Sequence, residues 1–105
     1  MPTFTRAQAD ALLPKARPLL EDLQRRVATY RRRPTDPVAR EIEALLREVA
    51  ELGIEVKDPE RGLIDFRSKM RGREVYLCWK LDDGDRVAFW HELDAGFAGR
   101  KIIED

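Results

Sequence analysis

Apolar residues recur every three or four positions through the first half of the chain, which is the period of a helix with one buried face. Thr5 and Gln8 have the spacing of a capping box, so the first helix is predicted to begin after Thr5 and to end near Arg32. A proline inside a helix lacks a backbone N–H and crowds the preceding turn, so we expect a kink or a break near Pro14. The apolar positions of this helix are Leu12, Leu13, Ala16, Leu19, Leu20, Leu23, Val27 and Tyr30.

A second stretch with the same period follows a short connection rich in arginine and proline. Asp36 followed by Pro37 suits an N-cap and first turn, and Gly53 suits the position after a C-cap. The apolar positions between them are Val38, Ile42, Leu45, Leu46, Val49 and Leu52. Two helices joined by so short a connection run antiparallel, so residues 1–53 are predicted to form a helical hairpin.

After residue 54 the pattern changes to an alternation of apolar and polar residues, which is typical of strands. Strands are predicted around residues 63–67, at 74–81 and at 86–93, with turns at 71–72 and 82–85. The expected fold class is α+β, in which the N-terminal helical hairpin packs with a C-terminal three-stranded antiparallel meander and tail over residues 54–105. A length of 105 residues fits one domain, so residues 1–105 are expected to form a single domain.

The chain carries 20 basic and 20 acidic residues, so its formal net charge is zero. This balance argues against binding to a nucleic-acid backbone or to an anionic membrane. A single cysteine cannot form an internal disulfide, and we see neither a signal peptide nor an apolar stretch long enough to span a membrane. We therefore expect a cytoplasmic protein.

The two helices are rich in large apolar residues for so small a protein. Eight leucines belong to the two patterns: Leu12, Leu13, Leu19, Leu20, Leu23, Leu45, Leu46 and Leu52. A three-stranded sheet covers only part of such a surface. Two hairpins that pair about a twofold axis would bury the remainder as four helices, so we expect a homodimer formed through the helices.

The candidate metal site centres on His91, the only histidine, together with Asp65, Glu92 and Asp94. Imidazole and carboxylate groups are ligands of Zn, Mn and Fe. In a regular strand, however, His91 and Glu92 point to opposite faces, so both bind one ion only if a bulge reorients one of them. The alternative is a structural role, in which His91 is hydrogen-bonded to a carboxylate at the end of the sheet.

Two further features carry candidate chemistry. Cys78 is a conceivable nucleophile beside His91, but a cysteine flanked by Leu and Trp is typical of a small buried apolar residue. Trp90, Arg73 and Arg100 form the candidate ligand-binding set, because aromatic rings stack on bases or sugars while arginines contact phosphate.

Three phrases of the second half carry a resemblance to a known family. They are GLIDF at residues 62–66, GREVYLCWK at 72–80 and FWHELDAGFAGR at 89–100. They resemble the bacterial and archaeal proteins grouped as domain of unknown function 2203, and the Phe4-Thr5 and Leu13-Pro14 pairs are similar to the opening of that family. The turn at residues 82–85 departs from the Gly-Glu type of the family. The resemblance implies no activity, substrate or catalytic residue.

Together these features predict a small cytosolic protein that acts as a non-enzymatic, homo-oligomeric interaction or regulatory module. No cofactor is expected in that role, and the bound partner would be a protein or a small molecule. The alternative is a small metal-binding protein or a metal-dependent hydrolase with its site around His91.

Overall fold

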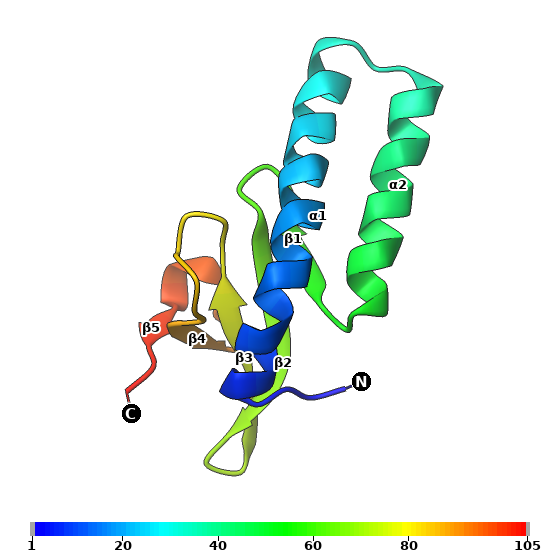
Figure 1. Ribbon diagram of the computed structural model, residues 1–105. Coiled ribbons are helices and arrows are strands. Elements are labelled where there is room, and N and C mark those ends of the chain that lie inside the picture. Colours follow the sequence, from blue (N-terminus) through cyan, green and yellow to red (C-terminus); the bar gives the residue numbers. More distant parts are fainter. Residues whose placement is uncertain (1, 105) are drawn as a thin grey trace.

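Figure 1 shows the computed structural model, which describes residues 2–104 of the chain. Two helices, α1 (Arg6–Arg32) and α2 (Asp36–Glu51), lie side by side and antiparallel, as the sequence predicts. A five-stranded antiparallel sheet of order β1-β2-β3-β4-β5 follows them. Its strands are β1 (Glu55–Asp58), β2 (Leu63–Met70), β3 (Arg73–Trp79), β4 (Phe89–Glu92) and β5 (Lys101–Ile102), and the short 3-10 helix η1 (Phe97–Gly99) precedes β5.

The predicted start of α1 is confirmed. Of the kink or break that the sequence predicts near Pro14, the break is absent. The Gln8 amide donates to Thr5 Oγ1 at 3.1 Å and the Thr5 amide donates to Gln8 Oε1 at 2.9 Å, which completes the capping box. The helix then runs from Arg6 to Arg32 through Pro14 and Pro18 without interruption. The physical reason is that burial of one whole face of α1 outweighs the two backbone hydrogen bonds that the prolines remove.

The N-terminus of α2 also differs by one position from the expectation. Thr35 is the N-cap, and Asp36 is the first helical residue with Pro37 beside it in the first turn. The carboxylate of Asp36 therefore lies at the positive end of the helix dipole. This charge interaction stabilises the helix even though Asp36 is not the N-cap.

The sheet has five strands rather than the three that the sequence predicts. The added strands β1 and β5 are four and two residues long, too short for a period of two to stand out in a sequence. The predicted strand at 86–93 is reduced to β4, because α1 binds its first part instead. The Val87 amide donates to Asp10 Oδ1 at 2.6 Å, and Arg6 Nε donates to the Val87 carbonyl at 2.8 Å.

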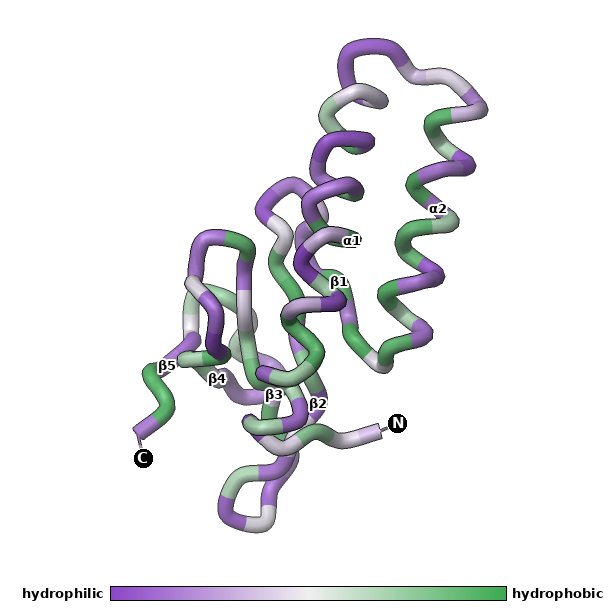
Figure 2. Tube along the Cα trace, in the orientation of Figure 1, coloured by the Kyte–Doolittle hydropathy of each residue, from purple (hydrophilic) through white to green (hydrophobic). Residues whose placement is uncertain are grey.

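The core lies between α1 and one face of the sheet. Fully buried side chains of α1 pack there against those of β2 and β3 and against Val87: Ala9, Leu13, Ala16, Leu20, Ile64, Phe66, Leu77, Trp79 and Val87. The apolar positions spread along both helices and through the central strands (Figure 2). The sheet therefore has one apolar face toward α1, and the opposite face is free to carry polar groups.

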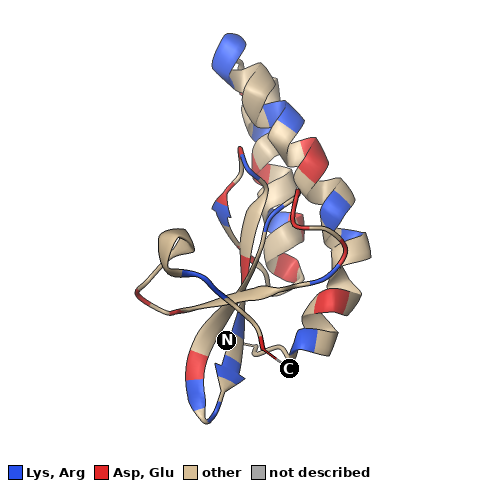
Figure 3. Cartoon of the chain, turned by 90° about the vertical axis from the view of Figure 1, so that its left-hand side faces the viewer, with Lys and Arg blue, Asp and Glu red and all other residues tan. Residues whose placement is uncertain are grey.

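The hairpin extends beyond the sheet, which makes the molecule elongated, with principal extents of 46 × 24 × 24 Å (Figure 1). Positions of basic and acidic residues are interspersed along both helices and the sheet (Figure 3). Within residues 2–104, neither helix has the length and apolar character needed to cross a membrane.

Candidate functional site

Three reactive side chains meet on the sheet face that points away from α1. Asp65 of β2 is the register partner of Cys78 of β3, and Cys78 is in turn the partner of Phe89 of β4. His91 follows Phe89 by two residues and therefore lies on the same face of the sheet. Because β2 and β4 both flank β3, the His91 ring reaches across β3 to Asp65.

The three side chains are buried and close. His91 Nε2 lies 3.0 Å from Asp65 Oδ2, and the ligand atoms of Asp65, Cys78 and His91 all lie within 4.8 Å of one another. No more than 2% of each residue is exposed. Asp65 Oδ1 is buried and has no hydrogen-bond partner among the described residues. A buried carboxylate oxygen without a partner is costly, and the neighbouring Cys78 thiol acts on the Asp65 carboxylate as a hydrogen-bond donor.

The hydrogen bonds of His91 determine where its protons lie. Nδ1 is 2.7 Å from the carbonyl oxygen of Glu92, which can only accept, so Nδ1 carries a hydrogen and donates it. Two acceptors do not approach to 3.0 Å, so a second proton lies between Nε2 and Asp65 Oδ2. The Asp65–His91 pair thus shares one proton between His91 Nε2 and Asp65 Oδ2.

Burial governs the electrostatics of the other two groups. It raises the pKa of Asp65, and the neighbouring His91 partly opposes this rise. Burial, together with the Asp65 charge, raises the pKa of the Cys78 thiol to about 11, although Arg100 acts in the opposite direction. A thiol with so high a pKa is protonated at neutral pH and is a poor nucleophile, so the site does not favour cysteine catalysis.

A small cavity of about 140 Å³ adjoins the three side chains. Lys57 and Tyr76 line it from the sheet, and Leu93, Gly96 and Phe97 line it from the segment that connects β4 to β5. Arg100 holds the end of this segment, because its guanidinium binds both carboxylate oxygens of Asp83, at 2.7 and 3.2 Å. The segment therefore covers the site and leaves room beside it for a few water molecules.

The structure brings together only part of the metal-ligand set that the sequence predicts. Asp65 and His91 meet, whereas Glu92 points to the other face and binds Arg73 at 2.7 Å. Asp94 is exposed in the turn after β4. Cys78 joins Asp65 and His91 in their place. The alternation of Leu77, Cys78 and Trp79 along the strand predicts which face of the sheet Cys78 occupies. No spacing of residues in the sequence, however, identified Cys78 as a ligand.

The candidate ligand-binding residues are divided between the two faces of the sheet. Trp90 and Arg73 lie on the face toward α1 and line one open groove. Arg100 lies on the opposite face, where it stacks on Phe89 at 3.8 Å and binds Asp83. These three residues therefore do not form one site.

The comparison with protein families gives one match. The family model described as "Uncharacterized conserved protein (DUF2203)" matches residues 26–103, which is most of the chain. The searches of the curated proteins and of the solved structures give no significant match.

Proposed function

We propose that this chain, which belongs to the DUF2203 family of uncharacterized conserved proteins, binds a divalent transition-metal ion, Zn²⁺ foremost, through Asp65, Cys78 and His91. The observation that carries the proposal is the convergence of three buried ligand atoms within 4.8 Å of one another. A carboxylate, a thiolate and an imidazole are all ligands that Zn²⁺ accepts.

Charge balance supports the proposal. The bound form of the site needs an ionised Asp65, a thiolate at Cys78 and a neutral His91. These two negative charges cancel the two positive charges of the ion, so the occupied site is neutral. A neutral buried site avoids the large cost of leaving a net charge in a medium of low dielectric constant.

The surroundings of His91 support it as well. A metal-binding histidine usually donates its other ring N–H to a carbonyl or carboxylate, which fixes the ring and its tautomer. The bond from His91 Nδ1 to the Glu92 carbonyl does this and leaves Nε2 for the ion. Three protein ligands leave one position of a four-coordinate ion for water, and the adjoining cavity offers the space.

The proposal is tested by metal binding to protein purified without a histidine tag. Equilibrium dialysis should give one Zn²⁺ per chain, and bound Co²⁺ should show the thiolate-to-cobalt absorption that a cysteine ligand produces. Asp65→Asn, Cys78→Ser and His91→Gln should each abolish tight binding. Asp94→Asn is the matched control, since it removes an exposed carboxylate near His91 and should change nothing.

Two results would contradict the proposal. One is less than stoichiometric Zn²⁺, Mn²⁺ and Fe²⁺ on the wild-type protein. The other is tight binding that persists in the three ligand variants while their far-ultraviolet circular dichroism shows the native fold.

A second candidate function is a homodimeric interaction module formed through the helical hairpin. One chain already buries Leu13, Leu20, Leu23 and Leu45. Support for dimerisation therefore comes from two side chains of the hairpin, Tyr30 of α1 and Leu46 of α2, which are 39% and 36% exposed. Large exposed apolar side chains on a projecting hairpin fit contact with a second copy of the chain.

Sedimentation velocity tests the dimer. The wild-type protein should have the mass of two chains at micromolar concentration, and Leu46→Glu should shift it to the mass of one. Leu93→Glu is the matched control, because Leu93 is also exposed, at 41%, but lies outside the hairpin. A wild-type protein with the mass of one chain would remove this candidate.

A further inference from the structure

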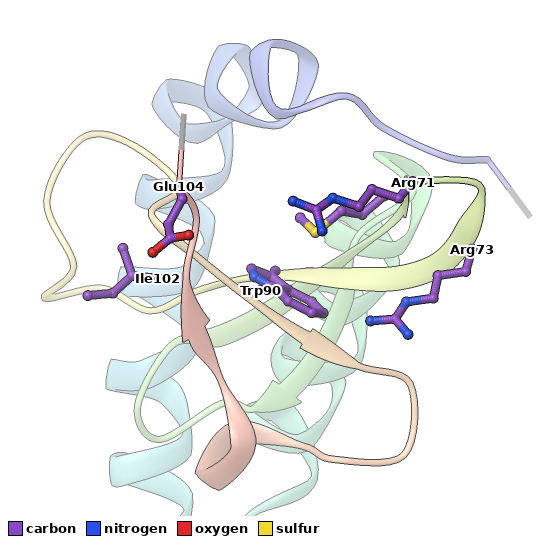
Figure 4. A pocket seen from close by; sticks show the side chains of 6 residues that line it. Arg71, Arg73, Trp90, Ile102 and Glu104 are labelled. Carbon is purple, nitrogen blue, oxygen red and sulfur yellow. The ribbon is translucent and has the colours of Figure 1, made fainter.

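A second hollow lies on the other face of the sheet, apart from the proposed metal site. It is an open groove of about 480 Å³ lined by Met70, Arg71, Arg73, Trp90, Ile102 and Glu104 (Figure 4). Its volume is within the range of about 300–1,000 Å³ that small-molecule sites occupy. The proposed metal ligands lie on the opposite face, so the groove requires an explanation of its own.

The groove combines an aromatic side chain with cations. The ring of the half-buried Trp90 has the Arg73 guanidinium at 5.9 Å and the Lys101 ammonium at 5.1 Å from its centroid. The Arg71 guanidinium projects over the same hollow (Figure 4). Arg73 binds Glu92, whereas the guanidinium of Arg71 makes no hydrogen bond or ion pair with any residue of the described part of the chain.

The backbone at Arg71 shows that the choice of arginine there has a cost. β2 and β3 are joined by a two-residue turn, Arg71 and Gly72, whose φ angles of 52° and 82° are both positive. Such turns favour Asn-Gly or Asp-Gly, because other side chains crowd the backbone at positive φ. Arg71 is the one non-glycine residue with positive φ among residues 2–104. Strain that a small substitution would relieve, at a side chain with no partner in the fold, indicates a role for that side chain in binding.

We propose that this groove binds a planar aromatic phosphate of the size of a nucleoside monophosphate. The flat ring stacks at Trp90, beside the apolar surface of Met70 and Ile102. The phosphate binds Arg71, whose guanidinium offers two parallel N–H donors, and Arg73 adds a second positive charge. Glu104, on the opposite wall, accepts a hydrogen bond from an amino group of the ring (Figure 4).

AMP is the probe for the first test, with adenosine and inorganic phosphate as its two halves. ¹H–¹⁵N spectra of the full chain should show AMP shifting the Trp90 indole N–H and the Arg71 amide. Adenosine and phosphate should each bind at least about tenfold more weakly than AMP, because each loses either the charge-assisted contacts or the stacking. The proposal would be overturned if AMP at millimolar concentration shifted neither signal. It would also be overturned if inorganic phosphate bound as tightly as AMP.

Arg71→Asn separates binding from folding. Asparagine tolerates positive φ, so the variant should be at least as resistant to heat as the wild type, while its affinity for AMP falls about tenfold or more. Arg47→Ala is the matched control, since it removes an exposed arginine of α2 and should leave both properties unchanged. Trp90→Leu should also weaken AMP but not phosphate. Unchanged AMP affinity in Arg71→Asn would refute the assignment.

Discussion

The sharpest prediction concerns the protons that leave when Zn²⁺ binds. The apo site holds two: one shared by Asp65 and His91, and one on the Cys78 thiol, whose pKa is about 11. The bound ion requires an ionised Asp65, a neutral His91 and a Cys78 thiolate. Binding at pH 7 should therefore release two protons per ion.

The release of two protons sets the size of the pH effect. Each proton displaced makes the apparent affinity tenfold stronger for each unit by which the pH rises, as long as the apo site still holds that proton. Two protons give about 100-fold, which is about 2.7 kcal/mol of binding free energy per pH unit at 1.36 kcal/mol for each tenfold step. A site made only of Asp65 and His91 would give about tenfold.

The assay is calorimetric titration of the apo protein with Zn²⁺ at pH 7 in two buffers that differ in ionisation enthalpy. The difference in observed heat gives the proton count directly. A competing chelator at pH 6 and pH 7 then gives the affinity ratio. Cys78→Ser should release one proton fewer than the wild type, and Asp94→Asn should match the wild type. A wild-type count of one or zero would refute the assignment of Cys78 as a ligand.

Three other predictions concern the stability of the apo fold. Asp65→Asn should keep the free energy of unfolding within about 1 kcal/mol of the wild type, because the new amide N–H replaces the shared proton. Asp65→Ala should lower it by about 1–3 kcal/mol, because it leaves His91 Nε2 unpaired. Denaturation in urea compares the two variants. The Cys78 thiol loses its proton at higher pH in the folded state than in the unfolded chain, because burial raises its pKa from 9.0 to about 11. Its contribution to the free energy of unfolding is therefore complete below pH 9.0 and is lost as the pH rises toward about 11, by about 2–3 kcal/mol in all. Cys78→Ala should lack this part of the loss at alkaline pH in the same assay. Gly62→Ala places a Cβ 2.4 Å from Leu81 at a φ of 61°, whereas Gly72→Ala places one at a φ of 82° with no atom within 4 Å. Gly62→Ala should therefore lower the melting temperature clearly more than Gly72→Ala. Equal losses would show that the contact with Leu81 is not limiting.

Much of the framework could be predicted from local sequence signals, because those signals act over a few residues. The Thr5–Gln8 capping box and the helical periods predict α1 and α2 almost to the residue. The alternation around Cys78 predicts β3 and the faces of its side chains. Of the kink or break expected at Pro14, the break does not occur, because packing along the whole of α1 outweighs a local defect.

The number of strands could not be predicted in the same way. β5 has two residues and exists because the tail folds back onto β4, where Phe89 pairs with Ile102. The shortening of β4 depends on Asp10 and Arg6 of α1, more than seventy residues away in sequence. Contacts of that kind leave no periodicity near the strand that they limit.

The candidate sites, too, could be predicted only in part from the sequence. The sequence identified His91 and Asp65 as residues to consider, because imidazole and carboxylate chemistry is visible from residue type alone. It also placed His91 and Glu92 on opposite faces, which follows from strand geometry. Only the order of β2, β3 and β4 decided that Cys78 lies close to both Asp65 and His91, and that Trp90 and Arg73 lie away from Arg100. Residue type and local period are properties of neighbouring positions, whereas convergence in space depends on which strands the whole chain brings together.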